Sequence, residues 1–329
     1  MNFKATLLKL LYWAFIPTLL AFLLGFLNAW HPLFDSLSNF RVHLLLILLS
    51  LMVTLALFHE KPHNYRYLIL TFLGGVYLYY INLPFKNIEL DDKSHTFKQM
   101  QFNLSFRNSR IEEFKKYIVQ HPMDVITLQE VTPAHQRALE ELKTEAYKIE
   151  IKIEYPFIER KKGAYPYQTY CQFRGVGGGA ILSKHPIDES KTLCLEGEGL
   201  LWTQIKIDQQ PITVGSIHLH WPFPYSQQEQ IETIRPILEK MPKPSLISGD
   251  FNAVSWSDAV DKVATYSHTK VVDGMRWSIS LKKQLPLLPF MKLSIDHLLL
   301  SEELEVQTLK VEKDLGSDHF PIVSEVKYR

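Results

Sequence analysis

The chain has 329 residues, and its 36 Lys and Arg nearly balance 35 Asp and Glu, for a formal net charge of +1. This length permits one large domain or two ordinary ones, each with a core of its own. The balanced charge excludes a strongly basic nucleic-acid-binding chain and an acidic disordered one.

The charge is unevenly distributed along the chain. Residues 1–85 contain five Lys and Arg and two acidic residues, which leaves 31 basic and 33 acidic residues for 86–329. The first part is almost free of charge, whereas the second has the composition of an ordinary, slightly acidic globular domain. That acidity argues against tight, non-specific binding of nucleic-acid backbones by the second part, although it leaves room for a local basic groove.

Three stretches of the first part lack any charged residue: Leu10–Leu27, Val42–Phe58 and Tyr67–Phe85. A helix needs about 20 mostly apolar residues to cross a bilayer, and each stretch is close to that length. A cleaved signal peptide is an alternative for the first stretch, and a buried helical layer is an alternative for the whole region. No small-residue cleavage site follows the first stretch, however, and two further apolar stretches do. We therefore expect three transmembrane helices in a membrane domain of residues 1–85.

The cations between these stretches predict an orientation. The tail before the first stretch and the loop after the second carry two Lys or Arg each, whereas the loop between the first and second carries only Arg41. Cationic loops stay on the cytoplasmic side, so an odd number of spans places residues 86–329 outside the cytoplasmic membrane. Disulfides persist in such a compartment, but the spacing of Cys171 and Cys194 does not show whether they pair or remain free thiols.

Residues 86–96 are polar and are interpreted as a linker to a domain of residues 97–329. Helical spacing predicts helices over 109–119, 133–147 and 226–240, the second opened by Thr132 as cap and Pro133 at the first helical position. Short apolar runs predict strands over 97–105, 124–131, 179–183, 201–207, 212–218, 245–248, 294–301, 306–311 and 320–326. Many strands with a few helices indicate an α/β fold of two packed sheets flanked by helices.

Residues suited to acid–base or metal chemistry recur where these strands end. The segments are QFNLSF with Asn103, ITLQE with Glu130, SIHLH with His218 and His220, SGDFN with Asp250 and Asn252, SIDHLLLS with Asp296 and His297, and GSDHFPI with Asp318 and His319. Each segment alone has an ordinary structural explanation. Glu130 could complement a helix N-terminus, and the turn at Asp250 could be a simple Asx turn.

Together, and in this order, the segments resemble the endonuclease/exonuclease/phosphatase superfamily, which includes deoxyribonucleases, abasic-site endonucleases, neutral sphingomyelinases and inositol polyphosphate phosphatases. The resemblance covers residues 97–329. It implies a four-layered α/β sandwich with the site at one end of its two sheets, and metal-dependent hydrolysis of a phosphate ester. It also implies Mg²⁺ or Mn²⁺ as the cofactor, held by hard oxygen ligands. The metal-binding residues that it assigns are Glu130, Asp318 and Asn103.

The resemblance implies acid–base roles as well. His319 would be the general base that takes a proton from the attacking water, and Asp296 would fix the tautomer of His319. Asp250 and Asn252 would contact this water or the phosphate. His218 would donate to a phosphoryl oxygen or protonate the leaving group. Which of Asp250 and His319 removes the proton is left open.

Three histidines refine this interpretation. The run around His218 is similar to that of sphingomyelinase-type members, whereas abasic-site endonucleases usually carry a tyrosine near this position. His220 and His297 have weaker claims and are expected at the rim of the site, as substrate-binding residues. The sequence thus favours a membrane-anchored phosphodiesterase or phosphatase.

Two other functions stay open. One is a tethered nuclease acting on DNA or RNA, and the other is an inactive binding module that uses the same fold. The membrane tether and the slightly acidic domain favour a membrane-proximal phosphate ester over nucleic acid, because a tether raises the effective concentration near lipid. The lipid bilayer is the expected partner besides the substrate, and no protein partner is inferred.

Overall fold

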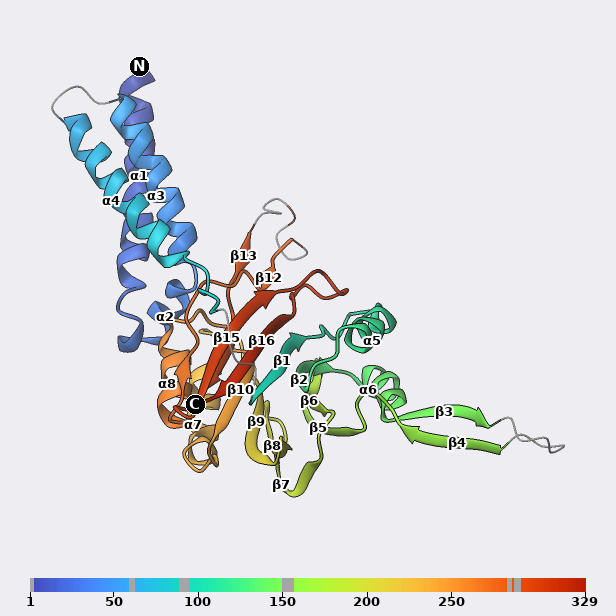
Figure 1. Ribbon diagram of the computed structural model, residues 1–329. Helices are drawn as coiled ribbons and strands as arrows, with labels where there is room; N and C mark the ends of the chain where they lie inside the picture. The colour runs from blue at the N-terminus through green and yellow to red at the C-terminus, as the bar shows by residue number, and fades with distance from the viewer. Residues whose placement is uncertain (1–2, 59–62, 89–94, 150–156, 283–285, 287–290) are drawn as a thin grey trace.

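Two six-stranded mixed sheets pack face to face, with helices on their outer faces (Figure 1). The structure is a computed structural model that describes residues 3–58, 63–88, 95–149, 157–282, 286 and 291–329. In Figure 1 the N-terminal helices project as a bundle from one end of the sandwich.

The first sheet has the strand order β15-β16-β1-β2-β6-β5. In that order its strands are Leu304–Val311, Ile322–Tyr328, Thr96–Asn103, Val125–Val131, Gly177–Ser183 and Tyr167–Arg174. Only β1 and β2 run parallel in it. Helices α5 (Ile111–Gln120) and α6 (Pro133–Glu140) cover its outer face, where Phe114 and Leu139 share one core with Met100 and Phe102 of β1.

The second sheet has the order β11-β14-β10-β9-β8-β7. Its strands are Lys270–Val271, Asp296–Leu300, Ser245–Asp250, Gln210–His218, Leu200–Ile207 and Ile187–Leu195. Here β9 and β10 are the parallel pair. Helices α7 (Gln227–Leu238) and α8 (Asp258–Tyr266) cover the outer face through a core that includes Ile231, Val260 and Ile247. The α/β sandwich of two packed sheets flanked by helices is thus confirmed.

The alternation of side chains along β1 explains how this strand serves two layers. Met100 and Phe102 point to the helices, whereas Phe97 lies in the apolar core between the sheets. Further along the strand, Gln99 donates a hydrogen bond to Ser248 at 2.9 Å and Gln101 donates one to Asp296 at 2.7 Å. The space between the sheets is therefore apolar at one end and polar at the other, and the polar end leads to the site.

Two short hairpins complete the fold. Strands β3 (Thr144–Ile149) and β4 (Phe157–Lys162) pair with each other, as do β12 (Ile279–Ser280) and β13 (Lys292–Leu293). The helix predicted over 133–147 ends at Glu140, followed by a 3₁₀ turn, η2 (Glu141–Lys143). The pairing of β3 with β4 prevails over the helical propensity of this segment.

The N-terminal part contains α1 (Phe3–Leu24), the 3₁₀ turn η1 (Asn28–Trp30), α2 (Pro32–Ser38), α3 (Arg41–Phe58) and α4 (His63–Ile81). Within the described residues, two helical segments are long and apolar enough to cross a membrane, Lys4–Leu24 and Arg41–Phe58. The prediction of three transmembrane helices is therefore wrong in its third member. Helix α4 forms there, but its five tyrosines, two glycines and Arg66 lower its mean hydropathy.

The predicted linker and the two cysteines have different outcomes. Of the predicted linker, 86–96, residues 89–94 lie outside the described residues, and the domain boundaries remain a prediction. The cysteines are resolved: Cys171 of β5 and Cys194 of β7 form a disulfide, with Cα atoms 5.4 Å apart. Because β5 belongs to the first sheet and β7 to the second, this bond ties the two sheets together at their edges.

Candidate active site

The carboxyl ends of four strands meet at one end of the sandwich, beside a cavity of about 390 Å³. Parallel neighbours end at the same edge of a sheet, and β1–β2 and β9–β10 are the parallel pairs of the two sheets. These four ends carry Asn103, Glu130, His218 and Asp250. Asp318 and His319 reach the cavity from the segment before β16.

Glu130 has a backbone conformation that L-residues rarely adopt, with φ at 55°. A bulge in the pairing of β2 with β6 accompanies it. The carboxylate accepts hydrogen bonds from Asn103 Nδ2 at 3.1 Å and from the Phe106 backbone N–H at 2.8 Å. Burial raises the pKa of Glu130 despite these bonds, and the carboxylate of Asp318 raises it further. Strained backbone that presents a carboxylate to a cavity clusters at functional sites.

Asn103 holds two carboxylates with one amide group. Its Nδ2 donates to Glu130 Oε1 and to Asp250 Oδ2, the latter at 2.9 Å. Its Oδ1 accepts the Ser105 backbone N–H at 2.9 Å. The amide oxygen is therefore already engaged with the backbone, and the structure places Asn103 where it positions Glu130 and Asp250.

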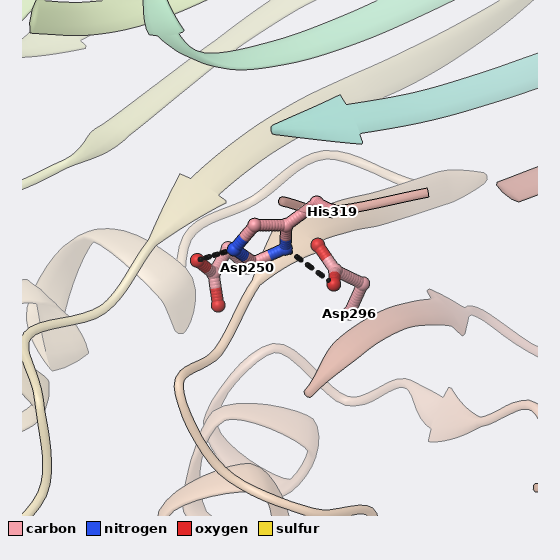
Figure 2. Close-up of side chains that lie close together, drawn as sticks. All are labelled: Asp250, Asp296 and His319. Atoms are coloured by element: carbon pink, nitrogen blue, oxygen red, sulfur yellow. Dashed lines mark hydrogen bonds and ion pairs between the residues drawn. The ribbon is translucent and has the colours of Figure 1, made fainter. Parts of the chain in front are cut away.

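His319 and Asp296 form a buried dyad, drawn in Figure 2. His319 Nδ1 lies 2.8 Å from Asp296 Oδ2, and Gln101 Nε2 donates to the other oxygen of Asp296 at 2.7 Å. This arrangement assigns the proton to Nδ1 and directs Nε2 toward Asp250. Burial lowers the pKa of His319, but the charges of Asp296 and Asp250 more than offset it and raise the pKa to about 10.

Asp250 lies between two imidazoles. Its Oδ2 is 3.6 Å from Nε2 of His319 and 3.6 Å from Nε2 of His218, and its Oδ1 accepts the Asn252 backbone N–H at 2.8 Å. Burial raises the pKa of Asp250 to about 7, although His319 opposes the shift. Burial also lowers the pKa of His218 to about 3, so its imidazole is neutral at pH 7 and can donate a hydrogen bond rather than a full proton.

Two groups of side chains lie where they could hold a metal ion. Atoms of Asp250, Asp296 and His319 lie within 4.8 Å of one another, but both oxygens of Asp296 are engaged by Gln101 and His319. That group fits an acid–base dyad better than a metal centre. Glu130 and Asp318 fit a divalent cation, because they are hard oxygen donors that line the cavity and a cation would relieve their mutual repulsion.

Two further residues that the sequence predicted for the site, Asn252 and His220, lie at the cavity. Asn252 lines the cavity and donates from Nδ2 to the Leu219 carbonyl at 2.8 Å. His220 also lines it, with its ring stacked on Phe173 and its Nδ1 2.9 Å from the Ser226 hydroxyl.

His297 does not reach the cavity. Adjacent residues of a strand point to opposite faces, so the orientation of Asp296 toward the site turns His297 away from it. Its Nε2 lies 2.7 Å from the Ala253 carbonyl, and its ring packs edge-on against Phe251. The structure makes His297 a residue of the core behind the site.

Sequence reasoning missed several residues that complete the site. Gln101 holds Asp296, and alternation along β1 with Asn103 could have indicated it. Arg107 and Arg174 line the cavity, and each guanidinium lies near the ring of the preceding phenylalanine, at 5.0 and 5.8 Å from the ring centroid. These arginines add cations to a cavity whose lining also includes carboxylates, imidazoles and aromatic rings.

The family model for the Endonuclease/Exonuclease/phosphatase family matches residues 100–319. The chain belongs to this family. Its members are generally hydrolases of phosphoesters and are typically dependent on a divalent metal. No curated protein matches the sequence significantly.

Solved structures are similar to this chain at low sequence identity, and the first of the following three shares its fold. The endonuclease/exonuclease/phosphatase from Bacteroides vulgatus is 14% identical over 71% of this chain and 99% of its own, with a TM-score of 0.53. D. rerio TDP2 complexed with a single-strand DNA product is 17% identical over 72% and 100%, with a TM-score of 0.49. Sphingomyelinase C from Streptomyces griseocarneus is 14% identical over 70% and 99%, with a TM-score of 0.46.

Proposed function

We propose that this protein is a membrane-anchored, divalent-metal-dependent phosphoesterase that hydrolyses a phosphodiester or phosphomonoester by in-line attack of an activated water. The observation that carries the proposal is that one cavity is lined by His319, which Asp296 holds from behind, and by the carboxylates of Glu130 and Asp318. Such an arrangement offers both a proton acceptor and cation ligands to a phosphate bound in the cavity.

Glu130 and Asp318 would hold the cation, with Asn103 fixing the position of Glu130. Mg²⁺ or Mn²⁺ bound there supplies neutralisation of phosphoryl charge. The arginines at the rim, Arg107 and Arg174, would bind the phosphate oxygens that remain exposed.

The proton of the attacking water goes to the Asp250–His319 pair. We treat the two groups as one acceptor because Nε2 of His319 lies 3.6 Å from Oδ2 of Asp250, so the charge of each group shifts the pKa of the other. Asp296 keeps His319 in the tautomer with Nε2 facing the cavity. Asn252 would orient Asp250 and the water, and His218 would donate its N–H to a phosphoryl oxygen.

A direct test uses the full chain in detergent with bis(p-nitrophenyl) phosphate. We expect turnover with Mg²⁺ or Mn²⁺, loss of turnover in EDTA, and losses of about 10²-fold or more in His319→Ala and Asp250→Asn. Asp261→Asn makes the same carboxylate-to-amide change on the exposed face of α8 and should keep full activity. Turnover that survives EDTA and both substitutions would refute the proposal.

The alternatives remain distinguishable. A tethered nuclease is favoured by the two rim arginines, which could contact a nucleic-acid backbone, and plasmid cleavage would reveal it. An inactive binding module is disfavoured because every acid–base and carboxylate position assigned from sequence is present in the cavity or directly behind it.

The anchoring and the location belong to the same proposal. Helices α1 and α3 would hold the protein in the cytoplasmic membrane, with α4 packed beside α3. Two spans no longer give the orientation that the charge pattern predicted for three, so the proposed placement of the catalytic domain outside the cytoplasm rests on the disulfide. The Cys171–Cys194 disulfide supports this side, because disulfides persist in extracytoplasmic compartments.

A further inference from the structure

The segment between the two apolar helices has its polar and apolar sides reversed. In η1 and α2 the side chains of Asp35 and Ser38 are buried, whereas Trp30 is 79% exposed and Leu33 is 42% exposed. A surface helix of a soluble protein shows the opposite arrangement. The apolar side of this segment therefore faces away from the rest of the described chain.

The buried polar side of α2 is fixed to the loop that begins at Asp250. Asp35 accepts hydrogen bonds from the Ser257 hydroxyl and the first backbone N–H groups of α8, at 2.9–3.2 Å. Asn39 accepts the Val254 backbone N–H at 2.8 Å. These bonds set the orientation of α2 relative to the catalytic strand β10.

A second contact joins α2 to the rim of the cavity. The Ser36 hydroxyl donates to the Phe223 carbonyl at 3.0 Å, and the rings of His31 and Phe223 lie 5.9 Å apart. Phe223 belongs to the uncharged loop 221–225, whose ends, Trp221 and Tyr225, line the cavity. The mouth of the site is thus adjacent to the segment that connects α1 and α3.

Six exposed apolar or aromatic residues from these two segments form what we term the interfacial patch: Leu27, Trp30, Leu33, Trp221, Phe223 and Tyr225. None of them carries a charge, and η1 and α2 connect α1 to α3 along the chain. Aromatic rings favour the boundary between lipid and water. The occupant that fits an uncharged aromatic surface beside two membrane helices is the bilayer itself.

We propose that the interfacial patch lies in the headgroup region of the leaflet that α1 and α3 enter, so that the cavity faces phosphoester headgroups of lipids in that leaflet. Arg107 and Arg174 at the rim supply cations for a headgroup phosphate. The choice of lipid as substrate rests on the proposed function. The position of the patch does not, so the two can be tested separately.

Depth measurements test the position of the patch. Both cysteines of the chain are in the disulfide, so Leu33→Cys and Phe223→Cys each introduce a single thiol for a nitroxide label. In the full chain in phosphatidylcholine vesicles, both labels should collide more often with O₂ than with an aqueous Ni²⁺ complex. Val119 on α5 is 50% exposed, and its Cys variant should show the reverse. A label at 223 that behaves like the one at 119 would overturn the proposal.

Activity measurements test the substrate. Phe223→Ser should release headgroups from vesicle phospholipid about fivefold or more slowly than the unmodified chain, since the patch loses a membrane contact. Its turnover of soluble bis(p-nitrophenyl) phosphate should be unchanged, and Val119→Ser should change neither rate. Plasmid cleavage without headgroup release would overturn the lipid assignment. Absence of turnover on the soluble diester would refute the proposed function instead, while the label depths would still decide the position of the patch.

Discussion

His319 donates a hydrogen bond from Nδ1 to Oδ2 of Asp296 over 2.8 Å, and neither side chain is appreciably exposed to solvent. Asp296→Asn keeps the shape but removes the charge that holds His319 in its tautomer. We expect turnover of a soluble phosphodiester to fall by about 10²–10⁴-fold. Substrate affinity should change little, because Asp296 does not line the cavity. Unchanged kcat would contradict the role of the dyad.

The Asp296→Asn substitution should also change how the stability of the fold depends on pH. The pKa of His319 is raised above its ordinary value to about 10, mainly by Asp296 and Asp250 acting against burial. A raised pKa contributes stability that is fully present below pH 6.5 and is lost as the pH rises through about 10. In EDTA, the Tm deficit of Asp296→Asn should therefore be largest near pH 6 and shrink toward pH 10. A deficit that grows with pH would show the opposite linkage.

The ionised carboxylate of Asp250 should lower the stability of the metal-free fold, although activity requires it. Burial raises its pKa to about 7, so ionised Asp250 destabilises the metal-free fold, increasingly as the pH rises from about 4 to above 7. Asp250→Asn mimics the protonated group and should melt a few degrees higher than the unmodified chain at pH 8 in EDTA, while losing activity. At pH 4 the two should melt together. A lower Tm for the variant at pH 8 would refute this account.

Glu130 should control metal affinity. Glu130→Gln keeps an oxygen for the Phe106 N–H but removes the charge, so calorimetric Mg²⁺ or Mn²⁺ affinity should fall by about tenfold or more. Glu113→Gln, on the exposed end of α5, is the matched control and should leave metal affinity unchanged. Equal metal affinity in both variants would show that Glu130 does not bind the cation.

The disulfide should stabilise the sandwich. Cys171 and Cys194 are separated by 23 residues, and closing a loop of that size contributes about 3 kcal/mol in the chain-entropy model. The double variant Cys171→Ala/Cys194→Ala should melt roughly 6–12 °C lower. Dithiothreitol should lower the Tm of the unmodified chain to a similar value and leave the double variant unaffected. A reductant effect on the variant would show another cause.

Asp35 should couple the membrane segment to the catalytic domain. Asp35→Ala removes the acceptor for three donors at the start of α8 and should cost roughly 1–3 kcal/mol of unfolding free energy. Asp35→Asn retains an acceptor oxygen and should lose less. Thermal melts of both variants in detergent provide the comparison, and equal losses would argue against a hydrogen-bonding role.

The fold could be predicted where the chain has a clear period or strong end signals. The Thr132-Pro133 start of α6 and most sheet strands were predicted on that basis. Strands β5 and β7 were missed, because their side chains are partly exposed and their pattern is mixed. Helix α8 was missed as well, although Ser257 caps it locally and Asp258 and Asp261 lie in its first turn, which are signals that the sequence carries.

The site was predicted from sequence motifs, and that prediction missed the contacts that depend on the three-dimensional fold. Segments such as SGDFN name Asp250 but cannot show that Gln101 holds Asp296, because that contact joins two sheets. Nor can they show that His297 turns away, which depends on the direction of β14. The third stretch was predicted to span the membrane because it contains no charged residue. Its tyrosines are uncharged but polar, and they lower its hydropathy below that of a span.

The rigid attachment of α2 to the loop after Asp250 has a kinetic consequence. A catalytic domain on a flexible linker samples a volume, whereas one fixed at two points beside its anchor meets substrate only in the plane of the membrane. Under the proposed arrangement, its rate would follow the mole fraction of substrate in the surface rather than the amount in solution. Diluting the bilayer with inert lipid would then slow the enzyme even when the total substrate is constant.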